Sequence, residues 1–373
     1  MIATPSDPEG VPLGKIDGAA GQLDSATEKQ GEPLPHPREN AGWGPRALEL
    51  RGGSRLHFGL FATSPGMPPH TARVYGGMGL MVEEPGQTLR AFLSRHWQGE
   101  DRIGPRLREF RDRIRGQLPE ITPIHLEEIT WIPGHFGLGS GTQLGLAVAK
   151  LMGALLGKEW GLEELCSLSG RGVRSAIGSH GFAKGGFLVD AGHEAARIDS
   201  LGQIAARHDF PEQWPIVLCQ WSDRPGMSGA GEKAVFETLA HSDAAEIRRD
   251  RLCRLALLGV LPALVHGAWK EFGEAIGEFN TVAGEPFAVW QGGDQVPQSL
   301  AWLNFCRQNG VHGVGQSSWG PTLFAIAHDT DQARFLVDSW SRKGFGPPER
   351  IRIARARNEG ATVSAIPDSV DQV

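Results

Sequence analysis

The sequence contains few cysteines and no paired-cysteine motif. Its 4 cysteines, in a chain of 373 residues, are far apart and form no CxxC pair. This argues against a disulfide framework and against a cysteine-ligated zinc site. The 13 histidines include no HExxH pair, which argues against a zinc enzyme. We therefore expect free thiols in a reducing compartment.

Other absences concern partners and location. The first residues show no basic segment followed by an apolar stretch, and no run approaches the roughly 18 apolar residues of a membrane span. The net charge of −6 and the pI near 6.1 leave no broad basic surface for a nucleic-acid backbone. The sequence therefore predicts a cytoplasmic protein with no membrane and no nucleic-acid partner.

Glycine, by contrast, is abundant. The 51 glycines and 25 prolines gather in short groups beside apolar runs, which is typical of tight loops on a folded scaffold. At roughly 100 to 200 residues per domain, the length suggests two domains. Strand patterns are mixed with helix patterns without regular βαβ alternation, and this mixture predicts an α+β protein.

The two ends of the chain differ in composition from its middle. Residues 1–44 are rich in Gly, Pro, Glu, Asp and Gln and have no apolar period, so we expect a disordered extension. We expect a disordered tail at 358–373 for the same reason. Between them we place an N-terminal domain at 45–205, which carries the glycine loop described next, and a C-terminal domain at 206–357.

A glycine-rich segment, PGHFGLGSGTQLGLAVA from Pro133, carries the main chemical signal. It runs into a helical apolar period, so the amides of the first helical turn and the helix dipole favour a bound anion. No lysine follows the glycines as in a P-loop NTPase, and the spacing does not fit GxGxxG. Spacing alone leaves a phosphate site and an ordinary strand-to-helix turn both open. The candidate phosphate-binding residues are Gly137, Leu138, Gly139, Ser140, Gly141, Thr142 and Gln143.

The glycine segment resembles the phosphate loop of the GHMP kinases, the superfamily of galactokinase, homoserine kinase, mevalonate kinase and phosphomevalonate kinase. Two further segments match in the same order: GGSRLHFGLF resembles the first-strand motif, and GVGQSSWGPTLFAIA resembles the C-terminal glycine loop. The resemblance implies a GHMP-kinase-like two-domain fold. Its N-terminal domain would be ribosomal-protein-S5-like and its C-terminal domain ferredoxin-like.

More narrowly, the span from about Ala47 to Arg355 resembles the beta-ribofuranosylaminobenzene 5'-phosphate synthase family. The marks are SRLHFGL, RVYGGMGLMVEEP, GLGSGTQLGLA, RSAIGSHGFAKGGFLVDAGH and GVGQSSWGPT. The resemblance implies a pentosyltransferase of methanopterin biosynthesis. Such an enzyme condenses phosphoribosyl pyrophosphate with 4-aminobenzoate and releases carbon dioxide and pyrophosphate. The sequence does not distinguish 4-aminobenzoate from 4-hydroxybenzoate. The two acceptors differ only in an amine or a hydroxyl group, and one repositioned hydrogen-bond partner in the protein is enough to change which of them is preferred.

The alternative is a GHMP-family small-molecule kinase that uses ATP, and a non-catalytic protein that binds a phosphorylated ligand is a third interpretation. Many GHMP kinases place an acidic residue after the phosphate-loop helix, where this chain has His180 and Lys184. The synthase reaction needs no side-chain nucleophile, because the substrate's own amino group pushes electrons toward the attacking ring carbon. Donors that stabilise the departing pyrophosphate matter more.

The catalytic candidates are His180, Lys184 and Asp190. Asp190 ends the apolar strand GGFLVD and could accept from the aryl amine, coordinate Mg²⁺ or stabilise the oxocarbenium ion. It could equally cap the next turn, a common task for Asp. We expect Mg²⁺ to bridge phosphate oxygens, with protein ligands unknown.

Further cationic and polar side chains are predicted to hold the substrates. Arg55 and His57 share one face of a strand and could bind phosphate or the benzoate carboxylate. Arg171 and Arg174 are three apart, which predicts one helix face. Solvated surface and turn formation are the alternatives for these positions, and a homodimer is expected from base rates. The substrate-binding candidates are Arg55, His57, Arg174, Ser179, Gln316, Ser317 and Ser318, with Arg171 and Arg224 as further anion candidates.

Overall fold

The computed structural model describes residues 46–63, 73–99, 102–118, 121–172, 175–194, 197, 200–226, 235, 243–287 and 296–367. The chain divides into two compact units, Met1–Gly42 and Trp43–Val373, and every described residue belongs to the second unit. The extension expected at 1–44 lies outside the described residues. The division expected between 205 and 206 falls inside the second unit and stays a prediction.

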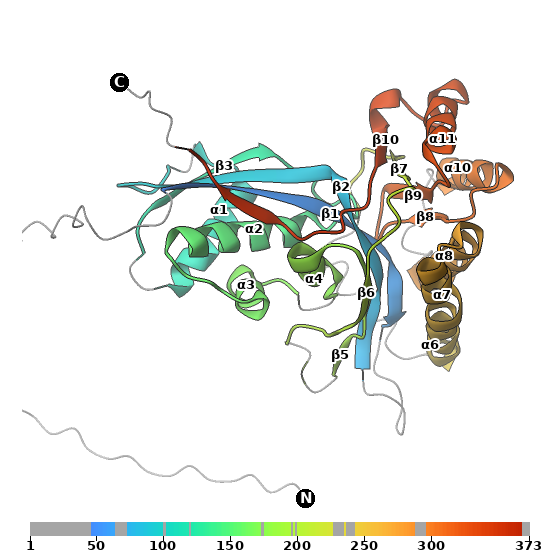
Figure 1. The fold of residues 1–373 in the computed structure, drawn as a ribbon, viewed down its shortest axis with the longest axis horizontal. Coiled ribbons are helices and arrows are strands. Elements are labelled where there is room, and N and C mark those ends of the chain that lie inside the picture. Colours follow the sequence, from blue (N-terminus) through green and yellow to red (C-terminus); the bar gives the residue numbers. More distant parts are fainter. Residues whose placement is uncertain are drawn as a thin grey trace, which may run out of the picture. The chain divides into compact units, whose positions relative to one another are not determined.

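Two long antiparallel strands form the spine of the first sheet, β1 (Ala47–Ala62) and β2 (Arg73–Leu93). The sheet has the order β11-β1-β2-β4-β6, and β3 and β5 also pair with β2 (Figure 1). As the alternation predicted, Leu56 and Phe58 of β1 are fully buried on one face. The other strands are β3 (Ile124–Thr130), β4 (Phe187–Asp190), β5 (His193–Glu194), β6 (Ile204–His208) and β11 (Thr362–Ala365).

Helices cover one face of this sheet, as Figure 1 shows. The most buried of them is α2, where the helical period of Leu144, Val148, Leu151 and Leu155 produces a fully apolar inner face. These side chains share one core with apolar residues of β1, β2 and β3. The helices of this layer are α1 (Pro105–Gln117), α2 (Ser140–Leu155), α3 (Leu162–Ser169) and α4 (Ile177–Lys184).

The second sheet is antiparallel, in the order β10-β7-β9-β8. The succession of its strands and helices is β-α-β-β-α-β, which is the ferredoxin-like arrangement expected for the C-terminal part. Its strands are β7 (Ile216–Gln220), β8 (Val314–Gln316), β9 (Thr322–Ile326) and β10 (Ile351–Ala354). Its α-helices are α6 (Asp243–Leu255), α7 (Leu261–His266), α8 (Trp269–Gly284), α10 (Val296–Gln308) and α11 (Thr330–Arg342). A π-helical turn, η3 (Ala256–Val260), joins α6 to α7, and short 3-10 turns are η4 (Glu285–Phe287) and η5 (Pro348–Arg350).

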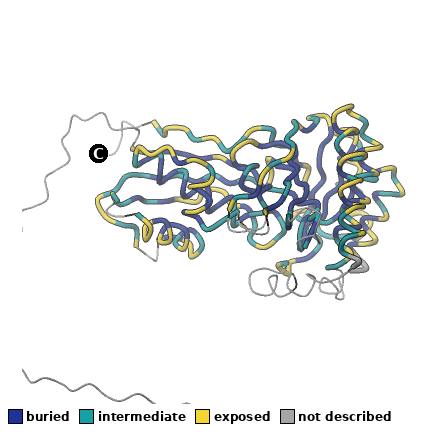
Figure 2. Tube along the Cα trace, turned by 90° about the horizontal axis from the view of Figure 1, so that it is seen from below, coloured by how far each residue is buried: buried dark blue, intermediate teal, exposed yellow. Residues whose placement is uncertain are grey.

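Aromatic side chains from both sheets form one continuous core. Phe58 of β1 packs edge-on against Phe324 of β9, with ring centroids 5.0 Å apart. Phe187 of β4 packs against Phe272 of α8 at 6.0 Å. In the trace of Figure 2, the buried stretches lie mostly in the interior of the described part of the chain. Because burial of large aromatic rings stabilises strongly, this core holds the two sheets together.

The expectation of a disordered tail at 358–373 is wrong for the part of this tail that the structure describes. Thr362–Ala365 form β11, which pairs antiparallel with Leu48–Arg51 of β1. The sequence of the tail is polar, which led to the expectation of disorder. However, β1 presents a sheet edge whose backbone groups need hydrogen-bond partners, and Thr and Val are residues that favour a strand at such an edge. Residues 368–373 lie outside the described residues.

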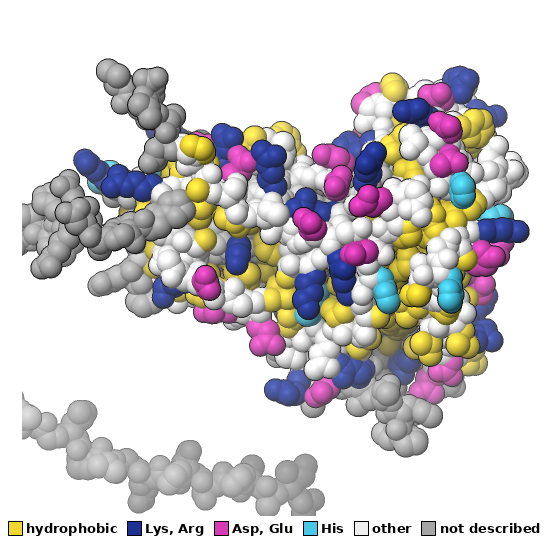
Figure 3. All heavy atoms as spheres, in the orientation of Figure 1, with side chains coloured by type: hydrophobic (Ala, Val, Ile, Leu, Met, Phe, Trp, Pro, Cys, Tyr) yellow, Lys and Arg dark blue, Asp and Glu magenta, His cyan; other side chains and the backbone are white. Residues whose placement is uncertain are grey.

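None of the helices in the described part of the chain is both long and apolar enough to cross a membrane. On the face drawn in Figure 3, cationic and acidic side chains of the described residues are interspersed.

Candidate active site

The predicted phosphate loop connects β3 to α2, and two of its glycines are required by geometry. Gly137 has φ 77° and Gly139 has φ 71°, a conformation that L side chains rarely adopt. A Cβ at Gly137 would lie 2.2 Å from the carbonyl oxygen of Ser317, and one at Gly139 would lie 3.1 Å from Nε of Arg55. The loop therefore approaches its neighbours as closely as only glycine allows.

The start of α2 carries backbone amides of the kind that an anion site needs. The amides of Ser140 and Gly141 lie in the first helical turn and precede any helical carbonyl that could accept from them. The amides of Thr142 and Gln143 instead donate to the carbonyl of Gly139, at 3.0 and 3.1 Å. Together with the positive end of the helix dipole, the first two amides favour an anion.

Two of the predicted loop residues point elsewhere. Gln143 is fully buried, and its Nε2 donates to the carbonyl of Gly178 at 2.8 Å. Leu138 packs in the core, and its carbonyl accepts from the amide of Arg55 at 3.0 Å. The structure therefore does not bring these two side chains to the anion site.

Three guanidinium groups surround the start of α2. A Cβ at Gly141 would lie 3.3 Å from Nη2 of Arg106 and 3.4 Å from Nη2 of Arg171, while Arg55 borders Gly139. Nη2 of Arg106 also lies 3.4 Å from Oγ of Ser140, to which it donates. Guanidinium groups bind phosphate and carboxylate through paired donors, so this cluster strengthens the anion site.

Sequence reasoning missed Arg106 and misplaced Arg171. Arg106 lies at the start of α1, and only the packing of α1 against α2 brings it to the loop. Arg171 was expected on a helix face, but it lies in the connection after α3, where its amide donates to the carbonyl of Cys166 and its guanidinium lies over the ring of Phe110. Arg174 lies outside the described residues.

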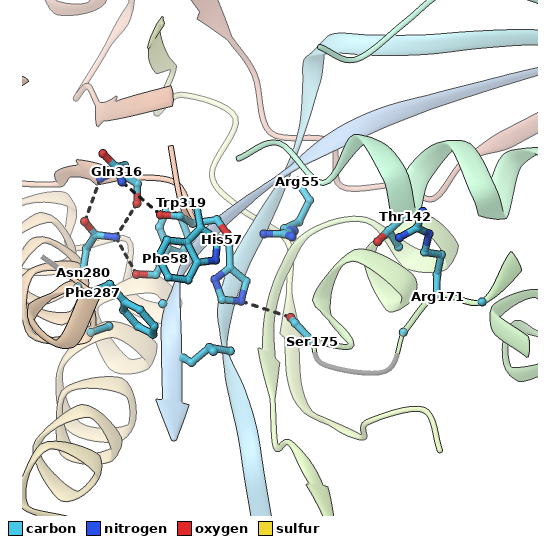
Figure 4. A pocket seen from close by; sticks show the side chains of 17 residues that line it. Arg55, His57, Phe58, Thr142, Arg171, Ser175, Asn280, Phe287, Gln316 and Trp319 are labelled. Atoms are coloured by element: carbon cyan, nitrogen blue, oxygen red, sulfur yellow. Dashed lines mark hydrogen bonds between the residues drawn. The ribbon is translucent and has the colours of Figure 1, made fainter. Parts of the chain in front are cut away.

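A cavity of about 460 Å³ opens beside this cluster. In Figure 4, Thr142 and Arg171 lie on one side, Phe287 and Trp319 lie on the other, and Arg55 and His57 lie between them. The lining residues come from β1, α2, the α3–α4 connection, α8, η4 and the C-terminal glycine loop. They are Arg55, His57, Phe58, Gly59, Leu60, Thr142, Gly170, Arg171, Gly172, Ser175, Asn280, Ala283, Gly284, Phe287, Gln316, Ser318 and Trp319.

The two ends of the cavity differ chemically. One end carries Arg171 and the start of α2, with Arg55 beside them, and the other is walled by the rings of Phe287 and Trp319, which meet edge-on at 4.9 Å. No Asp or Glu occurs among the described residues that line it. The described residues also form no group of His, Cys, Asp and Glu that could hold a metal ion.

His57 is buried between the two ends. Its Nε2 lies 3.3 Å from Oγ of Ser175. Burial, and then the charge of Arg55, hold the pKa of His57 well below its ordinary value of 6.5. The imidazole is therefore neutral near pH 7 and acts as a hydrogen-bonding group rather than as a cation.

The C-terminal glycine loop meets the phosphate loop. Oγ of Ser317 donates to the carbonyl of Gly137 at 2.7 Å and accepts from the amide of His57 at 3.0 Å. The amide of Ser318 donates to the carbonyl of His57 at 3.1 Å. Ser317 is fully buried and its hydroxyl bonds to the backbone of Gly137 and His57, whereas Gln316 and Ser318 line the cavity.

Asn280 of α8 is another residue that sequence reasoning missed. Its Nδ2 donates to the carbonyls of Phe58 at 2.7 Å and Gln316 at 2.9 Å. Its Oδ1 accepts from the amide of Gln316 at 3.0 Å. One side chain thus joins β1, β8 and α8 at the cavity, and nothing local in the helical sequence around Asn280 indicated this.

The three predicted catalytic residues do not line the cavity. Asp190 is fully buried behind it and accepts from two backbone amides. Nε2 of His180 lies 2.9 Å from the carbonyl of Gly202, and Lys184 is exposed in the last turn of α4. Ser179 is fully buried in α4.

Arg224 also lies outside the cavity lining. It is exposed after β7, and its amide donates to Oγ of Ser222 at 3.0 Å. The anion role considered for its side chain stays a prediction.

Comparison with known proteins agrees with this architecture. The family model for the GHMP kinases N terminal domain matches residues 106–186, and the model for the GHMP kinases C terminal domain matches residues 260–346. A homoserine kinase of Cytophaga hutchinsonii is similar in structure, with a TM-score of 0.59 at 14% identity over 86% of this chain and 98% of that one. A mevalonate diphosphate decarboxylase of Enterococcus faecalis has the same TM-score of 0.59 at 14% identity, over 87% and 100% of the two chains. The fold is that of the GHMP kinases.

Relatives in sequence narrow the family. A beta-ribofuranosylphenol 5'-phosphate synthase of Archaeoglobus fulgidus is 30% identical over 332 residues, which are 85% of this chain and 99% of the relative. The proteins of the same name from Methanothermobacter thermautotrophicus and Methanocaldococcus jannaschii are 29% and 27% identical, over 83% and 82% of this chain and 96% and 97% of theirs. The chain belongs to the beta-ribofuranosylphenol 5'-phosphate synthase family. The family expected from the sequence motifs is thereby confirmed, although the relatives are named for a phenol and not for an aminobenzene.

Proposed function

We propose that the protein joins phosphoribosyl pyrophosphate to a para-substituted benzoate and releases carbon dioxide and pyrophosphate. The bond from the anomeric carbon to pyrophosphate breaks, and a bond to the ring carbon forms. The ring then loses its carboxylate as carbon dioxide, and the electrons of that bond restore aromaticity. The observation that carries the proposal is a single cavity with a cationic end, an aromatic end and no carboxylate among its described lining residues.

The cationic end suits the departing pyrophosphate. Arg55, Arg171 and the amides of Ser140 and Gly141 present donors from three directions. Preorganised donors lower the barrier most where charge develops in the transition state, and here that charge develops on the leaving pyrophosphate. The same contacts hold two anionic reactants in one cavity, which lowers the entropic cost of their encounter.

The aromatic end suits the acceptor ring. Phe287 and Trp319 offer ring faces and edges, and Phe58 and Leu60 extend the apolar wall. Aromatic rings prefer offset or edge-on contacts of this kind. The acceptor's own para substituent supplies the electron pair, so the reaction needs no nucleophilic side chain.

The names of the relatives bear on the acceptor. A ribofuranosylphenol product supports 4-hydroxybenzoate, whereas the sequence motifs led us to expect 4-aminobenzoate. Gln316 carries a side-chain amide that can donate or accept near the aryl end. Both acceptors are therefore included in the test below.

The described residues do not fit a magnesium ion held by the protein. Mg²⁺ prefers oxygen ligands in an octahedron, with one or two carboxylates as a rule, and no carboxylate lines the described part of the cavity. The charge of the pyrophosphate is met by guanidinium groups and helix amides instead. The expected role of Mg²⁺ as a bridge between phosphate oxygens stays a proposal.

The kinase alternative is not favoured. A kinase of this fold would need a group to take the proton of the attacking alcohol, and no Asp or Glu occurs among the described residues that line the cavity. The homodimer and the cytoplasmic location stay predictions.

The test uses purified protein with phosphoribosyl pyrophosphate, Mg²⁺ and either 4-hydroxybenzoate or 4-aminobenzoate labelled in the carboxylate. We expect labelled carbon dioxide and pyrophosphate to appear in equal amounts with at least one acceptor. If neither product forms, and ATP is instead consumed with an alcohol from a panel, the kinase interpretation replaces this one.

A further inference from the structure

Asp190 is a buried carboxylate outside the cavity lining, and its two oxygens hold two different segments. It ends β4 and has no exposed surface. Oδ2 accepts from the amide of Ala176 at 2.7 Å, and Oδ1 accepts from the amide of Gly192 at 2.8 Å. One side chain therefore connects the start of α4 to the turn after β4.

The environment of Asp190 makes it costly in free energy to bury a carboxylate that has no role there. Burial raises the pKa of Asp190, and the two amide hydrogen bonds and the neighbouring His193 and His180 oppose this rise. The fit around it is tight, because a Cβ at Gly202 would lie 3.1 Å from Oδ1 of Asp190 and 3.1 Å from Nε2 of His193. A buried charged group is retained only where its hydrogen bonds are worth the desolvation.

The segment that Asp190 holds forms a wall of the cavity. Ala176 directly follows Ser175, which lines the cavity and whose Oγ lies 3.3 Å from Nε2 of His57. Arg171 and Gly172 line the cavity at its cationic end. The aromatic end comes from other elements, since Phe287 ends η4 and Trp319 belongs to the C-terminal glycine loop.

We propose that Asp190 is a positioning residue for the wall that binds phosphoribosyl pyrophosphate, acting through the amide of Ala176 on Ser175 and His57. It does not touch the reacting atoms. The inference rests on the proposed function for the identity of the ligand. It replaces the catalytic role that the sequence suggested for Asp190 with an indirect one.

The proposal separates the two substrates. If Asp190 positions only the wall at the cationic end, its loss shifts the groups that bind pyrophosphate and leaves the aryl end in place. Displacements of about 1 Å in such contacts can cost on the order of a hundredfold in rate. A merely structural role would instead lower the folded fraction and leave both KM values unchanged.

The experiment compares Asp190→Asn with the wild type in steady-state kinetics and in calorimetric binding of pyrophosphate. The amide keeps the size of the side chain, but its NH₂ group cannot accept from a backbone N–H. We expect KM for phosphoribosyl pyrophosphate and Kd for pyrophosphate to rise by about ten- to hundredfold. KM for the acceptor should stay within about threefold of the wild type.

Two further variants keep the test decisive. Val189→Ala is the matched control, because Val189 is a buried neighbour on the same strand whose side chain points to the opposite face; it should lower thermal stability and leave both KM values unchanged. Gly202→Ala places a methyl group against Oδ1 of Asp190 without removing the charge of the carboxylate. This variant replaces Asp190→Asn in the test if Asp190→Asn does not fold. It should raise Kd for pyrophosphate more than KM for the acceptor.

The outcomes distinguish this inference from the proposed function. If the wild type binds pyrophosphate but forms no aryl product, the proposed function fails, and the effect of Asp190 is still read from Kd. If the wild type is active and folded Asp190→Asn keeps the wild-type Kd and KM, the positioning role is overturned. An equal rise in KM for both substrates overturns it as well.

Discussion

Oγ of Ser317 donates a hydrogen bond of 2.7 Å to the carbonyl of Gly137 across 180 residues of sequence. The same oxygen accepts from the amide of His57 at 3.0 Å. A single buried hydroxyl thus joins the C-terminal glycine loop, the phosphate loop and the first strand. The cavity of the proposed synthase is assembled by this contact, because each of the three segments contributes residues to its lining.

Replacing Ser317 by alanine should therefore weaken both the fold and the site. The change leaves the carbonyl of Gly137 and the amide of His57 without their partner, which costs about 1 to 3 kcal/mol for a buried group. Urea unfolding should show this loss in the free energy of unfolding. Ser341→Ala, at an exposed position of α11, is the control and should change it by less than about 0.5 kcal/mol. Equal effects of the two substitutions would refute the role of Ser317.

Arg106 should contribute to binding of phosphoribosyl pyrophosphate although it does not line the cavity. Hydrogen bonds to charged groups are worth about 1.5 to 3 kcal/mol, so Arg106→Ala should raise KM for this substrate by about ten- to hundredfold. Added salt should reduce the difference between variant and wild type. Arg102→Ala removes an exposed cation from the preceding turn and should leave KM near the wild-type value. If both substitutions act alike, only the general charge of the protein matters.

Phe287 should act on the acceptor and not on the pyrophosphate. Phe287→Ala removes one ring of the edge-on pair with Trp319 and should raise KM for the acceptor by about tenfold, which corresponds to the loss of roughly 1.4 kcal/mol of aromatic contact. KM for phosphoribosyl pyrophosphate should stay within about threefold. Phe335→Ala on α11, remote from the cavity lining, is the matched control. A change confined to KM for phosphoribosyl pyrophosphate would contradict the assignment of the aromatic end to the acceptor.

His57 should make the protein less stable in mild acid. Its pKa in the folded state is held well below 6.5, so below pH 6.5 the unfolded chain takes up a proton that the folded chain does not. Stability from this group is present above pH 6.5 and is lost as the pH falls, by up to about 1.4 kcal/mol per pH unit. His57→Gln should flatten the curve of unfolding free energy between pH 6.5 and about 5.5. Urea titrations of both proteins across this range measure it, and identical slopes would disprove the neutral state of His57.

The phosphate loop could be predicted from sequence because its signals are local. Glycines at Gly137 and Gly139, followed at once by a helical apolar period, specify a turn and a helix start wherever the rest of the chain lies. The alternation around Leu56 likewise predicted which side of β1 is buried. The order along the chain of the three motifs that resemble those of the GHMP kinases then predicted the fold.

The rest of the site depends on contacts between distant segments. Arg106 and Asn280 come from helices with no local mark of function, and only their packing brings them to the loop or the cavity. Asp190 was recognised as notable, but sequence could not show that two backbone amides already occupy its carboxylate. The polar tail gave no hint of β11, because its pairing is set by the free edge of β1.

The most direct test is a crystal structure with phosphoribosyl pyrophosphate and benzoate, which lacks the para substituent that activates the ring. We predict pyrophosphate oxygens within hydrogen-bonding distance of the amides of Ser140 and Gly141 and of the guanidinium of Arg171, with the benzoate ring against Phe287 and Trp319. A structure in which the loop between Gly137 and Thr142 binds no phosphoryl group, while the pyrophosphate sits elsewhere, would contradict the account.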